Sequence, residues 1–382
     1  MAERPRRILF FIPEDWYVCS HRLPLVRAAK AEGFDVVVVT RVRDHAAPIV
    51  EAGAELVPIR LRRGFHGLRD EAAGLRELVR IYRRVRPDIV HHVTPKSVIY
   101  GSLAARLARV PCRVNALAGL GFVYTATGRR AALRRVAVST LFRLLLGGRG
   151  TRLIVQNGDD LSFFRDEIGV SAETIAVIRG AGVDTEAFAP AAREPEPPLR
   201  VCLVARLLGD KGVREAVAAA RVLRERRDDV RLLLVGRNDP VNPASIADDE
   251  LAAWRADGIV ELTGHVEDVP ALLRTCHAAL LPSYREGLPK SLLEAAACGL
   301  PVIATDVPGC REICRDGVNG LLIPPRDVDG IVAAVERLAD DRELRHRLGA
   351  ASRRLAVDDF SEALVAERTV ALYRELLGEV SR

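Results

Sequence analysis

The sequence predicts an α/β protein built from two doubly wound parallel sheets. Short apolar runs alternate with amphipathic stretches, and the runs are continuously apolar, as expected of strands buried on both faces. The pattern is interrupted by the Pro-rich segment APAAREPEPP at 189–198 and then restarts. The chain has 382 residues, enough for two domains with separate cores. Its 49% hydrophobic and 28% charged residues exclude a disordered chain and a multi-span membrane protein.

In the first half, strand and helix patterns alternate from the N-terminus. The apolar runs predict strands at Ile8–Ile12, Asp35–Thr40 and Ile89–Val93. The amphipathic stretches predict helices at Arg22–Glu32, Asp70–Val85 and Val98–Ala108. A strand, a crossover helix and a second strand form the unit from which parallel sheets are built.

The same alternation restarts after the Pro-rich segment. Strands are expected at Val201–Val204, Val230–Val235, Ile259–Leu262, Ala278–Leu281 and Pro301–Ala304, and helices at Val213–Arg226 and Pro289–Cys298. The expected domains are 1–188 and 199–359, joined by a linker at 189–198 and followed by a helix at 360–382 that packs back on the first domain. Two such Rossmann-like domains are expected to face each other across a cleft, with ligands at the carboxyl ends of the strands.

The loop after the first strand argues against one common function of such a domain. It reads IPEDWYVCSHRLPL and contains no glycine. A dinucleotide site requires a G-x-G-x-x-G turn at this position, because glycine permits the tight turn and the close approach of the pyrophosphate. A dehydrogenase is therefore disfavoured. The seven cysteines show no recurring spacing, so no zinc site is expected either.

Positive charge is concentrated in the first half of the chain. Residues 1–190 contain 30 Lys and Arg against 19 Asp and Glu, whereas residues 191–382 contain 27 against 32. Between Ile89 and Gly158 there are eleven basic residues and no acidic residue. Such a segment favours an anionic partner. Nucleic acid is not expected to be that partner, because no known binding motif is found.

The stretch 131–146 combines this charge with helical apolar periodicity. It is either a core-facing helix with a solvated basic face, or part of a basic helix at 129–149 that lies on an anionic membrane surface. No apolar run reaches the ~18 residues of a membrane span, and the run near the N-terminus is too short for a signal peptide. The expected location is therefore cytoplasmic, peripheral on the inner face of the plasma membrane.

Two carboxylates stand out in the second half. Glu286 lies in the loop after an expected strand, and Glu294 lies eight residues later on the expected helix. Both can face the carboxyl edge of the sheet. Pro289 suits the first turn of that helix, and Lys290 adds positive charge to its N-terminus, where anions bind favourably. This is a suitable place for a phosphate group with hydroxyl groups around it.

Two cations follow the strand at Val201–Val204. Arg206 and Lys211, in the sequence ARLLGDKG, are expected at the same carboxyl edge as Glu286. A bidentate guanidinium and a compact ammonium together suit a diphosphate. Each cation alone is an ordinary surface residue, but the combination with the two carboxylates predicts a binding site.

These motifs resemble the retaining glycosyltransferases of family 4, which have the GT-B fold. The resemblance is carried by the E-x7-E pattern in EGLPKSLLE, by the following GLPVIATDVPGCREICRDGVNGLLIPPRD and by the preceding ARLLGDKG. It extends over essentially the whole chain. The segments PDIVHHVTPKSVIYGSLAARL, GLGFVY, VQNGDDLSFF and VELTGHVEDVPALL are similar to those of bacterial enzymes that add N-acetylgalactosamine or a related sugar to an undecaprenyl-diphosphate-linked saccharide.

The resemblance implies roles for the residues that match. Arg206 and Lys211 are expected to hold the donor diphosphate, and Glu286 to face the donor sugar, as the catalytic groups. Glu294 is expected to bind the ribose hydroxyls. The other expected donor-binding residues are Gly287, Leu288, Pro289, Lys290 and Ser291. The expected acceptor-binding residues are His21, Arg22, His92, Lys96, Gly119 and Gly121.

The implied reaction is front-face substitution with retention, in which the departing diphosphate oxygen takes the acceptor proton. No metal and no cofactor are expected, because Arg, Lys and the helix N-terminus neutralise the leaving group. Two positions depart from the family pattern. Ala118, in ALAGLGF, replaces a common His, and the first loop lacks the usual glycine pair. His21 and Arg22 are candidates to replace that pair.

The predicted function is therefore transfer of an N-acetylhexosamine or a hexose from a UDP-sugar to a lipid-diphosphate-linked glycan in bacterial cell-surface polysaccharide or glycan assembly. Two alternatives remain open. One is a non-catalytic scaffold of a glycan assembly complex that binds sugar nucleotides, and the departure at Ala118 is compatible with it. The other is a GT-B sugar-nucleotide epimerase, against which the E-x7-E spacing argues.

Overall fold

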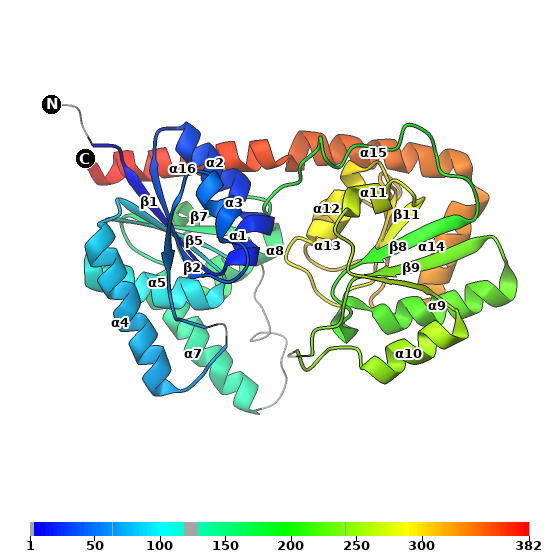
Figure 1. The fold of residues 1–382 in the computed structure, drawn as a ribbon, viewed down its shortest axis with the longest axis horizontal. Coiled ribbons are helices and arrows are strands. Elements are labelled where there is room, and N and C mark those ends of the chain that lie inside the picture. The colour runs from blue at the N-terminus through cyan, green and yellow to red at the C-terminus, as the bar shows by residue number, and fades with distance from the viewer. Residues whose placement is uncertain (1–3, 63, 118–128, 241, 382) are drawn as a thin grey trace. The chain divides into compact units, whose positions relative to one another are not determined.

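The computed structural model describes residues 4–62, 64–117, 129–240 and 242–381, with the backbone alone at 129–134 and 381. The chain forms two α/β units (Figure 1). Unit 1 comprises the chain up to Ala181 together with the C-terminal residues from Glu362, and unit 2 comprises Gly182–Ser361. Each unit contains one parallel sheet covered by helices on both faces, which confirms the predicted fold class.

Unit 1 contains a seven-stranded sheet with the order β3-β2-β1-β4-β5-β6-β7. Its strands are β1 (Arg7–Glu14), β2 (Asp35–Arg41), β3 (Glu55–Pro58), β4 (Ile89–Val93), β5 (Cys112–Ala116), β6 (Thr151–Val155) and β7 (Ile175–Val177). Its helices are α1 (Asp15–His21), α2 (Leu23–Ala31), α3 (Ala46–Glu51), α4 (Leu68–Val85), α5 (Pro95–Ala108), α7 (Arg129–Leu145), α8 (Gly158–Ser162) and α16 (Glu362–Ser381).

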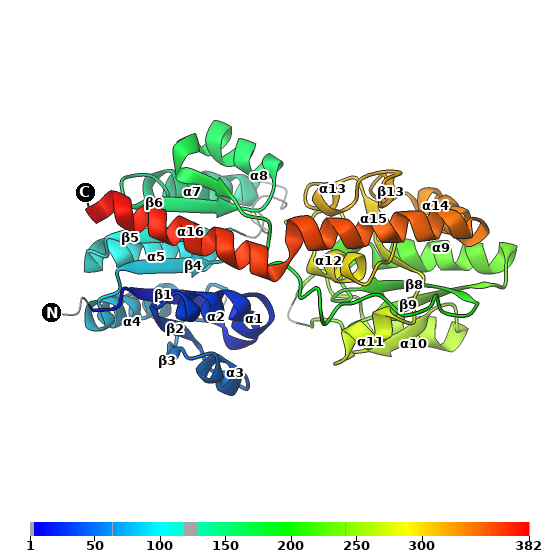
Figure 2. The same cartoon turned by 90° about the horizontal axis from the view of Figure 1, so that it is seen from above.

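The central strand β1 shows why its sequence is continuously apolar. Ile8, Phe10 and Ile12 pack into a core that α2 and α16 complete, whereas Leu9 and Phe11 point to the opposite core, which α4 and α5 cover. Figure 2 shows α16 beside α2 along this sheet. Burial of both faces disfavours an unpaired polar side chain in β1, because it would lose its hydration.

Unit 2 contains a six-stranded sheet with the order β10-β9-β8-β11-β12-β13. Its strands are β8 (Leu199–Val204), β9 (Val230–Val235), β10 (Glu261–Gly264), β11 (Ala278–Leu281), β12 (Val302–Thr305) and β13 (Gly320–Ile323). Its helices are α9 (Val213–Arg226), α10 (Asp248–Asp257), α11 (Val269–Leu273), α12 (Lys290–Ala297), α13 (Cys310–Ile313), α14 (Val328–Asp340) and α15 (Arg342–Phe360).

The two faces of β8 again belong to different cores. Val201 and Leu203 pack with α9 and α14, and Cys202 packs with α12 and α15. The direction of winding reverses between β8 and β11 in unit 2 and between β1 and β4 in unit 1. In doubly wound sheets, ligands bind outside the carboxyl ends of the strands at such a reversal. A ligand site is therefore expected at the segments that follow these four strands.

The Pro-rich segment differs from the linker that its composition predicts. The chain passes between the units at Ala181/Gly182 and at Ser361/Glu362, and residues 189–198 lie within unit 2. Glu194 holds the segment there through ion pairs with Arg342 at 2.6 Å, Arg345 at 3.0 Å and His346 at 3.2 Å. Its partners lie about 150 residues later in the chain, so that composition alone could not reveal them. Within the described ranges, no helix is long and apolar enough to cross a bilayer.

Candidate active site

The loop after β8 is docked against the end of β11. Gly212 adopts a φ of +70°, and a Cβ at this position would lie 2.1 Å from the carbonyl oxygen of Pro282. The backbone N–H of Tyr284 also donates to the carbonyl oxygen of Asp210 at 2.9 Å. Glycine is therefore required at 212 for both its conformation and its lack of a side chain. The two loops that flank the sheet reversal of unit 2 are thereby held together.

This docking brings Lys211 and Glu286 into contact. The Lys211 ammonium lies 2.5 Å from Oε1 of Glu286, and the Ser283 hydroxyl donates to the same oxygen at 2.7 Å. The side chains of Lys211 and Glu286 are 21% and 11% exposed. The sequence predicted both residues for the same edge of the sheet but not their direct pairing. A partly shielded ammonium at a sheet reversal can exchange its carboxylate partner for an incoming phosphate.

The turn that carries Glu286 is packed from two sides. Gly309 lies so close that a Cβ there would be 2.3 Å from the carbonyl oxygen of Gly287. The Tyr284 hydroxyl donates to Glu215 on α9 at 2.5 Å, and the guanidinium of Arg326 lies 4.5 Å from the centre of the Tyr284 ring. These contacts restrict the turn and keep Glu286 in place, as expected of a preorganised site.

The helix after this turn carries the second carboxylate. Glu294 lies on α12 with its side chain 15% exposed, and its carboxylate is 3.6 Å from the Lys290 ammonium one turn earlier. Burial raises the pKa of Glu294, and the adjacent Lys290 opposes this shift only in part. A partly desolvated carboxylate is a good acceptor for hydroxyl groups, since it regains hydrogen bonds when a ligand binds.

The remaining donor candidates surround these residues. Pro289 is the buried N-cap residue of α12, and Gly287, Leu288, Lys290 and Ser291 are half-buried around it. Arg206 lies on the same loop as Lys211, but its exposed side chain pairs with Asp239 after β9 at 2.8 Å. Sequence reasoning missed Asp239 and Ser283. Both follow apolar strands, and this position is the signal that could have indicated them.

In unit 1, the structure corrects the prediction for His92. This side chain is fully buried in β4. Its Nδ1 bonds to the carboxamide oxygen of Asn115 at 2.8 Å, and its Nε2 bonds to the Tyr82 hydroxyl at 3.0 Å. Both ring nitrogens are therefore used by the protein. Burial lowers the pKa of His92 to about 4, so that the ring is neutral near pH 7. His92 supports the fold and does not face an acceptor.

Lys96 is also engaged differently from its predicted role at an acceptor phosphate. Its ammonium donates to the carbonyl oxygens of Arg62 at 2.7 Å and Gly64, and to the Glu71 carboxylate at 2.9 Å. These three bonds use all three ammonium protons. Lys96 thereby ties the loop before α4 to the helices α4 and α5. The side chain acts as a structural clamp in this structure.

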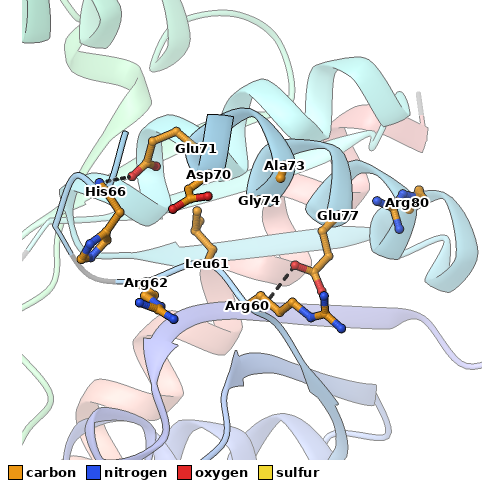
Figure 3. Close-up of a pocket in the computed structure, with 10 residues that line it drawn as sticks. All are labelled: Arg60, Leu61, Arg62, His66, Asp70, Glu71, Ala73, Gly74, Glu77 and Arg80. Atoms are coloured by element: carbon orange, nitrogen blue, oxygen red, sulfur yellow. Dashed lines mark hydrogen bonds between the residues drawn. The ribbon is translucent and has the colours of Figure 1, made fainter. Parts of the chain in front are cut away.

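The clamp lies beside a pocket of about 500 Å³ between this loop and α4 (Figure 3). The pocket contains both signs of charge: Arg60, Arg62 and Arg80 line it together with Asp70, Glu71 and Glu77. The backbone N–H groups of Arg60 and His66 donate to Glu77 and Glu71. No simple anion is selected by such a lining, because the carboxylates compensate the guanidinium groups.

The last acceptor candidates lie on the loop after β1 or beyond the described ranges. His21 ends α1, where its ring stacks on Tyr17. Arg22 is buried and donates to the carbonyl oxygen of Gly180 at 3.4 Å. Gly119 and Gly121, like the departure at Ala118, lie outside the described residues. Of the predicted acceptor residues that the structure describes, His21 is half-buried on the helix after β1, and Lys96 is half-buried on the helix after β4.

Comparison with known proteins agrees with this arrangement. Residues 184–355 match the family model of glycosyl transferases group 1, and residues 7–157 match that of glycosyl transferase 4-like proteins. The chain is 27% identical over 372 residues to the N,N'-diacetylbacillosaminyl-diphospho-undecaprenol alpha-1,3-N-acetylgalactosaminyltransferase of Campylobacter jejuni, covering 94% of this chain and 96% of that protein. It is 29% identical over 286 residues to an Escherichia coli UDP-Gal:alpha-D-GlcNAc-diphosphoundecaprenol alpha-1,3-galactosyltransferase, covering 70% of each.

Two solved structures are similar to this chain over nearly its whole length. A sucrose-phosphate synthase from Thermosynechococcus elongatus matches with a TM-score of 0.78 at 20% identity, covering 98% of this chain and 99% of that one. The Anabaena protein HepE in complex with UDP-glucose matches with a TM-score of 0.76 at 17% identity, covering 97% and 99%. The two parallel-sheet units, the loops at their reversals and these matches together place the chain among the glycosyltransferases of family 4, with the GT-B fold.

Proposed function

We propose that this protein is a retaining glycosyltransferase that moves a sugar from a UDP-sugar to a saccharide linked to a polyprenyl diphosphate. The observation that carries the proposal is the Lys211–Glu286 pair at the sheet reversal of unit 2, followed on α12 by the partly desolvated Glu294. The acceptor class is supported by the two curated relatives, whose names specify undecaprenol-diphosphate-linked acceptors. The transferred sugar is an N-acetylhexosamine or a hexose.

In the proposed reaction, the bond between the sugar anomeric carbon and the UDP oxygen breaks while the acceptor hydroxyl oxygen bonds to the same face of that carbon. The acceptor proton passes to the departing phosphate oxygen. Lys211 and Arg206 neutralise the charge that develops on UDP, together with the N-terminus of α12. Glu286 then faces the donor sugar, and Glu294 accepts hydrogen bonds from the ribose hydroxyls. This arrangement needs no metal ion and no cofactor.

A thermal-shift screen against UDP, GDP, ADP and dTDP tests the donor assignment. UDP at roughly 100 times its Kd is expected to stabilise the protein by about 2.7 kcal/mol, which raises Tm by several degrees. Glu294→Ala should abolish the shift, and Glu294→Gln should retain part of it, because a neutral amide oxygen accepts weaker hydrogen bonds. Without nucleotide, both variants should melt close to the parent, since burial already disfavours the ionised carboxylate.

Alternative outcomes of this screen are decisive. A shift with GDP alone would keep the transferase and contradict the UDP donor. The absence of a shift with every nucleotide would contradict the proposed nucleotide-sugar donor site. A matched control is Glu250→Ala: Glu250 pairs with Arg214 on the surface of the same unit at 2.8 Å, and its removal should leave the UDP shift unchanged.

We also propose that unit 1 docks on an anionic membrane through the basic helix at 129–149, most of which is α7. Val136 is 66% and Leu144 is 60% exposed on this helix, and Leu107 of the adjacent α5 is 51% exposed. Arg135 and Arg143 are exposed beside them. Apolar side chains surrounded by arginines are typical of surfaces that lie in the headgroup region. The acceptor would then be reached from the cytoplasmic face of the plasma membrane.

Charge reversal tests this docking. Arg129, Arg130 and Arg135 replaced together by Glu should weaken binding to phosphatidylglycerol-containing vesicles at least about 100-fold, at about 1 kcal/mol per cation near the surface. The same replacement at Arg255, Arg337 and Arg354, which are exposed on unit 2, changes net charge equally and should leave binding nearly unchanged. Co-sedimentation measures both. Equal losses in the two triple variants would contradict a docking role for the helix.

A further inference from the structure

An aromatic surface lies on the short helix that follows β1. The chain has two tryptophans. Trp254 is buried, as is usual for so large an apolar side chain, whereas Trp16 is 42% exposed. The Trp16 ring meets Tyr17 edge-to-face with centres 5.6 Å apart, and Tyr17 stacks on His21 with centres 4.2 Å apart and planes 4° from parallel. Trp16, Tyr17 and His21 thus form one continuous surface, called the aromatic platform below.

The platform is held rigidly from beneath. Asp15 is fully buried, and its carboxylate accepts hydrogen bonds from the backbone N–H groups of Trp16 at 2.8 Å, Arg43 at 2.6 Å and His45 at 3.1 Å. Burial raises the pKa of Asp15, but these bonds outweigh it and hold the pKa below its usual value. An ionised carboxylate therefore fastens the first turn of α1 to the loop after β2. Exposed rings on a fixed helix lose little freedom when they bind a ligand.

The position of the platform is that of a ligand site. Asp15 directly follows β1, and the winding of the unit 1 sheet reverses between β1 and β4. This is where doubly wound sheets bind their ligands, outside the carboxyl ends of the strands. An exposed tryptophan costs solvation free energy without contributing to the core. Its presence at the sheet reversal is explained if a ligand covers it.

The chemistry of the platform selects the ligand class. The face of an aromatic ring carries negative partial charge, and the C–H face of a pyranose carries positive partial charge, so that the two stack favourably and exclude water. A lipid surface is a poorer match, since Arg43 beside the platform pairs with Glu14 at 3.8 Å and Asp15 adds a second carboxylate. A nucleotide is not the expected ligand of the platform either, because the proposed function binds the nucleotide ribose at Glu294 in unit 2.

We infer that Trp16, with Tyr17 and His21 behind it, is the subsite that stacks on a pyranose ring of the acceptor saccharide. The inference rests on the proposed transferase function and specifies where unit 1 receives its substrate. Trp16 supplies the stacking face, and Tyr17 sets the orientation of Trp16.

Kinetics on a water-soluble acceptor, a short-chain prenyl diphosphate carrying an N-acetylhexosamine, test the inference. Trp16→Ala should raise the acceptor KM about 10- to 100-fold, in line with the loss of one aromatic stacking contact, while the UDP-induced rise in Tm stays unchanged. Trp16→Phe keeps a stacking face and should stay within about threefold of the parent. Phe65→Ala removes a more exposed ring, 69% accessible, from another loop and should not change KM.

Fluorescence provides a test that does not depend on turnover. Trp254 is buried in unit 2, so that changes of the emission on titration with the same prenyl-diphosphate saccharide report on Trp16. A saturable change that is lost in Trp16→Phe supports the subsite. An unchanged KM in Trp16→Ala together with no emission change would overturn it, even if UDP binding and transfer were intact. Weaker vesicle binding in Trp16→Ala with an unchanged KM would also overturn it and assign the ring to the membrane.

Failure of the proposed function has a different signature. The absence of any nucleotide shift and of any transfer would remove the transferase, and the saccharide titration would still decide whether Trp16 contacts a sugar. The stability of the variant can be checked by its Tm. Trp16→Ala should melt within a few degrees of the parent, because Trp16 is 42% exposed and belongs to none of the buried core clusters of the described residues.

Discussion

Lys211→Met is expected to lower kcat about 10²- to 10³-fold, the usual loss when one group that stabilises developing charge is removed. In the proposed reaction the leaving UDP gains negative charge, and the Lys211 ammonium is positioned to compensate it. Without nucleotide, this ammonium is held by Glu286 at 2.5 Å. Methionine retains the apolar stem and removes the charge. The KM for the donor should rise less than kcat falls, because the charge develops mainly in the transition state.

The Glu286 side of the pair gives a linked result. Glu286→Gln should also reduce kcat strongly. The kcat of the double variant should be only slightly below that of the less active single variant, because the two residues act as a unit. Arg221→Met is the matched control. Arg221 pairs with Asp257 at 2.8 Å on the surface of the same unit, and its loss should leave kcat within twofold. A Lys211→Met enzyme with the parent kcat would refute the proposed leaving-group role.

The stability of unit 1 is expected to fall by about 3 kcal/mol between pH 6.5 and pH 4 through His92 alone, given a pKa lowered from 6.5 to about 4 at 1.36 kcal/mol per unit. The folded pKa lies below the unfolded value, so the unfolded chain binds the proton more tightly. The stabilisation is complete above pH 6.5 and is lost as the pH falls towards 4. Burial lowers the pKa of His91 in the same direction.

Urea denaturation of a chain with Trp254→Phe, followed by tryptophan emission at pH 4.5, 5.5, 6.5 and 7.5, measures this dependence, since Trp16 is then the remaining tryptophan and lies in unit 1. His92→Gln should be less stable at pH 7.5, because it disrupts the bonds to Tyr82 and Asn115, but its stability should change less with pH. The exposed His265 is the control, and His265→Gln should reproduce the parent profile. An unchanged slope in His92→Gln would show that this ring does not titrate on unfolding.

The strands that lie in the middle of each sheet could be predicted from the sequence. The runs at Ile8–Ile12, Asp35–Thr40, Val230–Val235 and Ala278–Leu281 overlap β1, β2, β9 and β11, because burial on both faces requires continuous apolar residues. Some strands that lie at a sheet edge or carry polar side chains were missed. β3 and β13 are edge strands, and β5 contains Arg113 and Asn115, so that their local pattern is too weak to indicate pairing.

The residue types of the candidate site could likewise be predicted from the sequence. Strand ends mark the carboxyl edge of a parallel sheet, so Lys211, Glu286 and Glu294 could be placed there from sequence order and residue type. Their partners could not. The Lys211–Glu286 contact joins residues 75 positions apart, and it depends on the close approach of Gly212 to Pro282.

Two unit 1 residues show the same limit: His92, whose predicted role the structure contradicts, and Lys96, whose ammonium has three partners within the protein. His92 and Lys96 follow the pattern of a phosphate-binding strand end, and their residue types permit that function. Both ring nitrogens of the histidine are hydrogen-bonded, to Tyr82 and Asn115. The ammonium of the lysine donates to Glu71 and to two backbone carbonyl oxygens. Composition and periodicity specify which faces are buried, since hydrophobic burial is non-directional. Hydrogen bonds are short and directional, so whether a polar side chain is free to meet a ligand depends on partners that distant parts of the chain bring within about 3 Å.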